Sequence, residues 1–201
     1  MINLGEKGIV NVFNEGLSLF RGNLAVFVPD IYEAETAANQ QEILAWWGNP
    51  NNQVVAQVGY TKGPVQGLQY AVTIGSESQV ASRRFVGNFM SETSTNMTYS
   101  STFESNYIIG VLGPNQNWLL WSQMLAKWVL LYYTQTLETS YGLFNQRISL
   151  GPLQPYPDSM GDSVFPFMRT LTLTAQHEDS WTSLPVQAIK TASMTTSNST
   201  S

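Results

Sequence analysis

The fold is decided by the stretch NWLLWSQMLAKWVLLYYTQTLETSY, residues 117–141. Large apolar side chains recur in it at three- and four-residue steps: Trp118, Trp121, Leu125, Trp128 and Tyr132. This spacing places them on one face of an α-helix. Ser122, Gln123 and Lys127 are predicted to form its narrow solvent-facing side, and Gly142 is predicted to end it in a left-handed turn. We therefore expect one long helix, buried along an aromatic face.

A strand is predicted at residues 165–177, because apolar and polar side chains alternate there. Its apolar side holds Phe167, Leu171, Leu173 and Ala175, and its polar side is rich in threonine. Further strands are expected at residues 98–112 and 148–150, with residues 151–162 as a loop. The expected fold class is therefore α+β, with the long aromatic helix packed on a mixed or antiparallel sheet.

The first third of the chain is predicted to hold helices at residues 9–20 and 33–47, the second with a strand as its alternative. The apolar run at residues 24–28 between them is interpreted as a first strand. Residues 54–60 and 68–74 are predicted to pair as a hairpin around a turn that contains Gly63-Pro64.

Residues 75–97 are rich in Ser, Thr, Gly and Asn and are interpreted as a long loop or an extended arm. Residues 182–201 are expected to form a Ser/Thr-rich C-terminal tail. The predicted domain organisation is one α+β domain over residues 1–181, followed by that tail.

Composition excludes several classes of protein. The 201 residues contain no cysteine and one histidine, which excludes disulfides, thiolate metal sites and a cysteine nucleophile. Charged residues make up 11% of the chain, against about 25% in an average protein. A neutral, amide-rich surface is typical of a subunit that buries its flanks against neighbours; a low-charge surface without a partner is the alternative. The net charge of −5 argues against an electrostatic nucleic-acid binder.

The common catalytic motifs are missing, including the nucleophile elbow, the phosphate-binding loop and paired zinc-binding histidines. A hydrolase triad would have to use His177 with Asp179 or Asp158, and we expect His177 to be an ordinary surface residue instead. We therefore expect no enzyme activity and no cofactor.

Two groups of acidic residues could hold a divalent cation: Asp158 with Asp162, and Asp30 with Glu33 and Glu35. Neither group has the spacing of a known calcium loop, so we expect solvated turn acids. No signal peptide is visible at residues 1–7, which predicts synthesis and assembly in a cytoplasm.

Four segments together resemble the tail-terminator or neck (head-to-tail connector) proteins of tailed bacteriophages. They are Tyr107-Ile108-Ile109-Gly110-Val111, the helix at residues 118–136, Gly151-Pro152-Leu153, and the strand from Arg169 to Trp181.

This resemblance implies a virion protein of the tail or neck that forms a ring, expected to be hexameric. Such a ring ends the tail tube and joins it to neighbouring connector and tube or sheath proteins, while DNA passes through the lumen without sequence-specific binding. It implies no active site, no metal and no membrane. Arg83, Arg84 and Trp181 are the candidate subunit-interface residues. The alternative functions are a baseplate, fibre or carbohydrate-binding module with exposed tryptophans, or an enzyme that uses His177 or the loop aspartates Asp158 and Asp162.

Overall fold

The computed structural model describes residues 4–59, 67–80, 88–92, 97–113, 116–155 and 167–183. The fold is α+β, as predicted. The helices are α1 (Leu4–Gly22), α2 (Leu24–Ile31), α3 (Ala37–Gly48), α4 (Gln116–Tyr132) and α5 (Thr134–Tyr141). The strands are β1 (Val54–Val58), β2 (Leu68–Gln79), β3 (Asn88–Glu92), β4 (Met97–Leu112), β5 (Phe144–Pro155) and β6 (Phe167–Ser183).

The strands form one mixed six-stranded sheet in the order β1-β2-β4-β6-β5, with β3 paired to β4. β1 and β2 are parallel, with Val54 opposite Leu68, and every other pair is antiparallel. The predicted hairpin of β1 and β2 is therefore wrong. Residues 59–67 join the two strands, and at about 3.3 Å per extended residue they exceed the length of the five-residue β1. The connection is therefore long enough to bring the chain back to the end of the sheet at which β1 begins, so that β2 can run parallel to β1.

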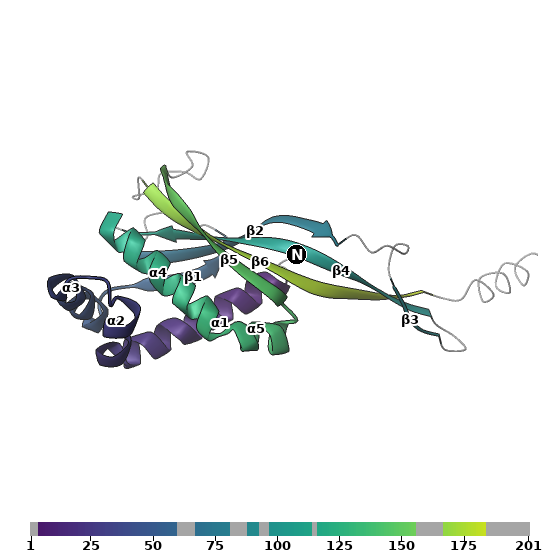
Figure 1. The fold of residues 1–201 in the computed structure, drawn as a ribbon, viewed down its shortest axis with the longest axis horizontal. Coiled ribbons are helices and arrows are strands. Elements are labelled where there is room, and N and C mark those ends of the chain that lie inside the picture. Colours follow the sequence, from purple (N-terminus) through teal and green to yellow (C-terminus); the bar gives the residue numbers. More distant parts are fainter. Residues whose placement is uncertain are drawn as a thin grey trace, which may run out of the picture.

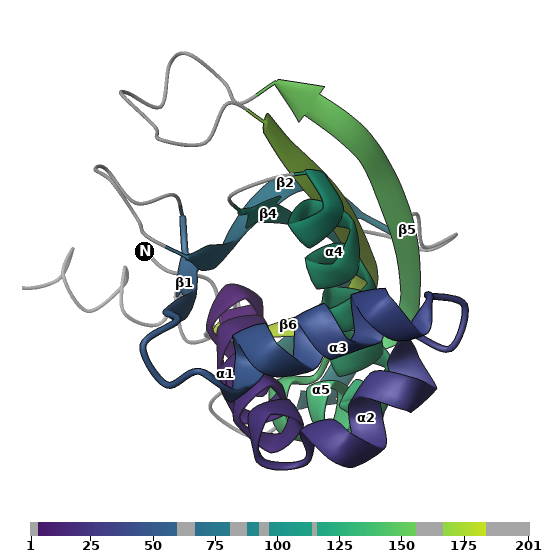
Figure 2. The same cartoon turned by 90° about the vertical axis from the view of Figure 1, so that its left-hand side faces the viewer.

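The helices gather over one end of the sheet (Figures 1 and 2). Between the helices and the sheet lies an aromatic core, in which the rings of Phe13 and Tyr70 are 5.1 Å apart and those of Phe20 and Trp47 are 5.0 Å apart. Tyr32 and Tyr70 are buried, and their hydroxyls donate to the backbone carbonyls of Trp121 and Ser122. These bonds satisfy the only polar atoms that the two side chains bring into the core.

The aromatic segment forms two helices rather than the predicted one, because α4 ends at Tyr132 and α5 begins at Thr134. The Thr134 hydroxyl donates to the carbonyls of Leu130 and Leu131, at 3.1 and 2.9 Å. Such side-chain bonds compete with the backbone ladder and bend helices. The predicted stop is confirmed, because Gly142 has φ +67° after α5.

The orientation of α4 also differs from the prediction. Ser122 and Gln123 are buried, whereas Leu131 and Tyr132 are more than half exposed. Gln123 donates to the carbonyls of Gly151 and Thr170, where the pairing of β5 and β6 shifts register. Hydrogen bonding to these carbonyls explains why an amide occupies a buried position.

Helices α1 and α3 confirm their predictions, and Thr36 caps α3 by accepting from the backbone N–H of Asn39. Residues 24–28 belong to α2, so their interpretation as a strand is wrong. Phe27 of α2 contacts Phe20 and Trp128, with ring centroids 6.5 and 4.9 Å apart. This tertiary packing overrides the strand preference of an apolar run that contains Val26 and Val28.

The sheet runs on beyond the helices (Figure 1). We call this part the sheet extension: residues 76–79 of β2, β3, residues 97–106 of β4 and residues 174–183 of β6. In β2, the side chains from Leu68 to Val72 are buried and those from Ile74 to Gln79 are exposed. The predicted loop at residues 75–97 is therefore wrong for residues 75–79, 88–92 and 97, which are strand; its residues 81–87 and 93–96 lie outside the described residues.

Candidate functional site

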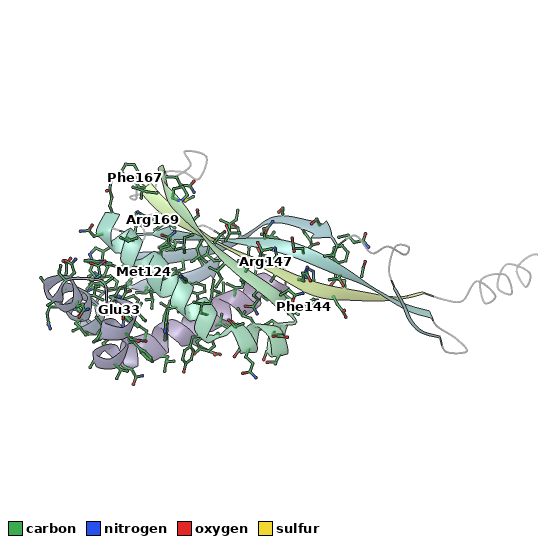
Figure 3. The ribbon with its side chains drawn as sticks, viewed as in Figure 1. Glu33, Met124, Phe144, Arg147, Phe167 and Arg169 are labelled. Atoms are coloured by element: carbon green, nitrogen blue, oxygen red, sulfur yellow. The ribbon has the colours of Figure 1, made fainter. Side chains whose placement is uncertain are left out.

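A pocket of about 770 Å³ lies where the helical body meets the sheet extension. The body contributes the start of α1, the end of α5 and the first residue of β5, and the extension contributes β2 and β6. Its lining residues are Leu4, Gly5, Glu77, Tyr107, Tyr141, Gly142, Leu143, Phe144, His177, Glu178 and Asp179. Phe144, which is labelled in Figure 3, stands at the start of β5 and is one of the lining residues.

Two glycines let α1 approach the pocket wall. A Cβ on Gly5 would lie 2.2 Å from the Tyr107 hydroxyl, and a Cβ on Gly8 would lie 2.5 Å from the Tyr141 ring. Both distances are shorter than any ordinary carbon contact, so only glycine allows this packing. The hydroxyl of Tyr141 also accepts a hydrogen bond of 3.1 Å from the Asn11 amide, which ties α1 to the end of α5.

His177 lies between two carboxylates. Its Nε2 is 3.6 Å from Glu77 Oε2 and 4.0 Å from Asp179 Oδ2. The imidazole stacks on Phe103 with ring centroids 5.9 Å apart, and its Nδ1 is buried without a hydrogen-bond partner among the described residues. Glu77 in turn accepts a hydrogen bond of 3.0 Å from the buried Ser105 hydroxyl. These contacts fix the imidazole and the Glu77 carboxylate on the extension side of the pocket.

Tyr107 forms part of the pocket wall and is fully buried. Its hydroxyl has no hydrogen-bond partner within the part of the chain that the structure describes. Burial raises the pKa of this phenol, the nearby Ser105 hydroxyl offsets part of that rise, and the negative charges of Glu77, Glu6 and Asp179 add to it. The phenol therefore stays neutral near pH 7, with its oxygen next to an acidic cluster.

The acidic side chains of the pocket suit a cationic ligand better than an anionic one. Glu77, Glu178 and Asp179 are the carboxylates of the lining, and His177 is the only lining residue that can carry a positive charge. Among the described residues, no group of three or more His, Asp or Glu side chains has a metal-binding arrangement. An organic cation with an apolar stem fits the mixture of carboxylates and aromatic walls.

The structure brings some of the sequence candidates together. His177 and Asp179 lie near each other, as the hydrolase alternative required. The group nearest to the imidazole Nε2, however, is another carboxylate, that of Glu77. No hydrogen bond from a serine or threonine hydroxyl to His177 occurs in the described residues. Asp158 and Asp162 lie outside the described residues.

The other candidates are dispersed. Asp30 and Glu33 are exposed, and Glu35 accepts a hydrogen bond of 2.7 Å from the Asn39 amide; Figure 3 labels Glu33 in the region of α2 and α3. Arg83 and Arg84 lie outside the described residues. For Trp181 the structure describes only the backbone, which pairs with Tyr99 in β6 and β4.

Sequence reasoning missed two important residues of the pocket. Glu77 was assigned to the predicted loop, and Tyr107 was considered only as part of a strand. The glycine pair Gly5 and Gly8, three residues apart and just before the predicted first helix, is the available signal for a close helix contact.

The tryptophans do not favour the carbohydrate-binding alternative. Trp47, Trp118 and Trp121 are buried and Trp46 and Trp128 are partly buried, so none of the five whose side chains are described is exposed.

Across the described residues, no helix has both the length and the apolar character needed to cross a membrane. No family model matches the sequence, and a search of curated protein sequences finds no match.

Proposed function

We propose that this chain is a structural subunit of a ring at the head-tail junction of a tailed bacteriophage, without enzyme activity. In this proposal the ring, expected to be hexameric, ends the tail tube, connects it to the neck and lets DNA pass through its lumen. The observation that carries the proposal is the sheet extension, whose strands run beyond the helices that cover the rest of the sheet (Figure 1).

An extension of this kind adds little stability to a monomer. Ile74, where the exposed part of β2 begins, and Val80, directly after the strand, are both more than a third exposed. Isolated strands have little stability in water, and exposed strand surface promotes pairing with other chains. In the proposed ring, neighbouring subunits cover this surface.

Composition and pattern give further support. Charged residues are only 11% of the chain, as expected for a subunit with large contact surfaces. The net charge of −5 agrees with a lumen that repels DNA and lets it slide. The segments that resemble terminator and neck proteins include β6 from Arg169 to Trp181, which forms one side of the extension.

The test compares two serine substitutions with the wild type. Ser78 is exposed on β2 within the extension, and Ser18 is exposed on α1 within the body. We expect the purified wild type to form rings with a central pore in electron micrographs, and Ser78→Arg to reduce ring formation by at least about tenfold, because it places a charge in a contact surface. Ser18→Arg is the matched control and should assemble like the wild type. A wild type that remains monomeric at every concentration would refute the proposal.

A further inference from the structure

The pocket between the helical body and the sheet extension has negative charges that solvent can reach. Glu77, Glu178 and Asp179 are its three carboxylates, and no lysine or arginine is among the described residues that line it. The side chains of Asp179 and Glu77 are 64% and 38% exposed. His177 lies close to both, and its imidazole, when protonated, offsets at most one of the three charges. A cation from solvent can therefore reach carboxylates that are not fully balanced.

The buried hydroxyl of Tyr107 is a second feature of the pocket, independent of its charge. The side chain is fully buried, and its oxygen has no hydrogen-bond partner within the described part of the chain. The oxygen lies at the pocket wall, because a Cβ on Gly5, another lining residue, would overlap with it. The nearby Ser105 hydroxyl donates its one proton to Glu77. A ligand that donates a hydrogen bond to the phenol oxygen would remove the penalty of leaving it unpaired.

The remaining walls of the pocket are largely aromatic and apolar. Tyr141 and Phe144 contribute rings, and Leu4 and Leu143 contribute aliphatic side chains. The Tyr141 hydroxyl accepts a hydrogen bond of 3.1 Å from Asn11, which holds this ring in place. The volume of about 770 Å³ lies within the range of about 300–1,000 Å³ that is usual for small-molecule sites.

A guanidinium group on a hydrocarbon stem matches these three features. It has five N–H donors and no acceptor, it forms forked bonds with carboxylates, and its flat face stacks on aromatic rings. The stem suits the apolar walls. A metal ion fits less well, because among the described residues no three His, Asp or Glu side chains are arranged to hold one.

We propose that this pocket binds a guanidinium group on a hydrocarbon stem, either as a free small molecule or as the arginine side chain of another protein. The guanidinium group pairs with Glu77 and Asp179 and donates to the Tyr107 hydroxyl, while the stem lies against Tyr141 and Phe144. This inference goes beyond the proposed ring and does not depend on it, because all the lining residues belong to one chain.

The experiment titrates the wild-type protein with matched ligands by isothermal titration calorimetry. Butylguanidinium should bind with a Kd of about 1 mM or tighter. Butylurea has nearly the same shape without the charge and should bind at least about tenfold more weakly. Butylammonium keeps the charge but loses the fork and should also bind more weakly. N-acetylarginine methylamide distinguishes the two sources: tighter binding than that of butylguanidinium identifies a protein side chain, and weaker binding identifies a free small molecule.

Two conservative variants locate the site. Asp179→Asn and Tyr107→Phe should each weaken the binding of butylguanidinium by at least about fivefold, because each removes one acceptor of the cation with little change in side-chain size. Glu42→Gln on α3 and Tyr132→Phe on α4 are the matched controls, since both residues are exposed and outside the lining, and should bind like the wild type. Circular dichroism checks that all four variants fold.

Three outcomes would overturn the inference. The first is a wild type that binds no butylguanidinium at about 10 mM. The second is binding of butylurea or butylammonium as tight as that of butylguanidinium. The third is wild-type affinity in either pocket variant. Each of these outcomes leaves the ring proposal untouched, and a protein that binds the cation but forms no ring contradicts the ring proposal alone.

Discussion

The two ends of β4 lie in different surroundings although one unbroken strand joins them. In the helical body, Tyr107, Ile109 and Val111 are fully buried, and each such side chain contributes about 1.5–3 kcal/mol by burial. In the extension, side-chain hydrogen bonds cross the strands instead: Thr174 donates to Asn106 at 2.6 Å, and Asn106 donates to Ser76 at 2.8 Å.

One sheet therefore combines two kinds of stabilising interaction. Cross-strand polar pairs contribute about 0.2–1 kcal/mol each, which is well below the burial of one large apolar residue. The body is therefore expected to determine whether the chain folds, and the extension is expected to determine which other chains it contacts.

The largest expected effect comes from deleting core volume in the body. Ile109→Ala should lower the free energy of unfolding by about 2–5 kcal/mol, because it leaves a cavity beneath the helices. Thr102→Ala, seven residues earlier in the same strand and partly exposed in the extension, should cost less than about 1 kcal/mol. Urea unfolding followed by circular dichroism measures both, and equal losses would remove the distinction between the two halves.

A second comparison uses two glutamines. Gln123→Leu should cost about 1–3 kcal/mol, because two partly buried carbonyls lose their donor. Gln176→Leu in the extension removes two side-chain hydrogen bonds, one of 3.3 Å donated to Glu104 and one of 2.7 Å accepted from the exposed Asn145, and should cost about 1 kcal/mol or less. The same unfolding assay applies, and a neutral Gln123→Leu would show that the amide is dispensable at this position.

Alkaline pH should destabilise the body. Burial raises the pKa of Tyr70 and of Tyr32. Below about pH 10 the folded and unfolded states both keep these protons, so the two groups add no pH dependence. Above about pH 10 the unfolded state releases them first, and the free energy of unfolding falls by up to about 1.4 kcal/mol per pH unit for each tyrosine. Tyr70→Phe should reduce this slope, measured by urea unfolding between pH 9 and pH 11 at steps of about one unit; an unchanged slope contradicts the assignment.

The smallest energetic effect concerns local opening. Amide protons at Thr102 and Glu104 in the extension should exchange with solvent faster than those at Ile109 and Val111, because no helix covers the extension. Hydrogen exchange followed by mass spectrometry on the monomeric protein resolves the two halves. Equal protection would mean that the sheet opens only as one unit.

Local patterns in the sequence were sufficient to predict the body in outline. The helical spacing predicted α1 and α3, the β-rich run at residues 107–112 predicted β4, the alternation of residues predicted β6, and Gly142 marked the end of α5. These signals depend on neighbours in the chain, which a single sequence contains.

The errors arose where distant residues decide. Phe27 is helical because Phe20 and Trp128 pack against it, and Gln123 is buried because a strand shift presents two carbonyls to it. The pocket was missed for the same reason. His177 and Asp179 are near in sequence, but Glu77 reaches them from β2, with β4 between the two strands.

The bend at Thr134 has a mechanical consequence for the pocket. Helix α5 is eight residues long, about 12 Å, and its far end carries Tyr141 and Gly142 into the pocket wall. A change of roughly 10° in the bend at Thr134 therefore moves that wall by roughly 2 Å, because the wall lies at the far end of α5. Substitutions at Thr134 can therefore adjust the width of the pocket from a distance, while every residue that lines it stays the same.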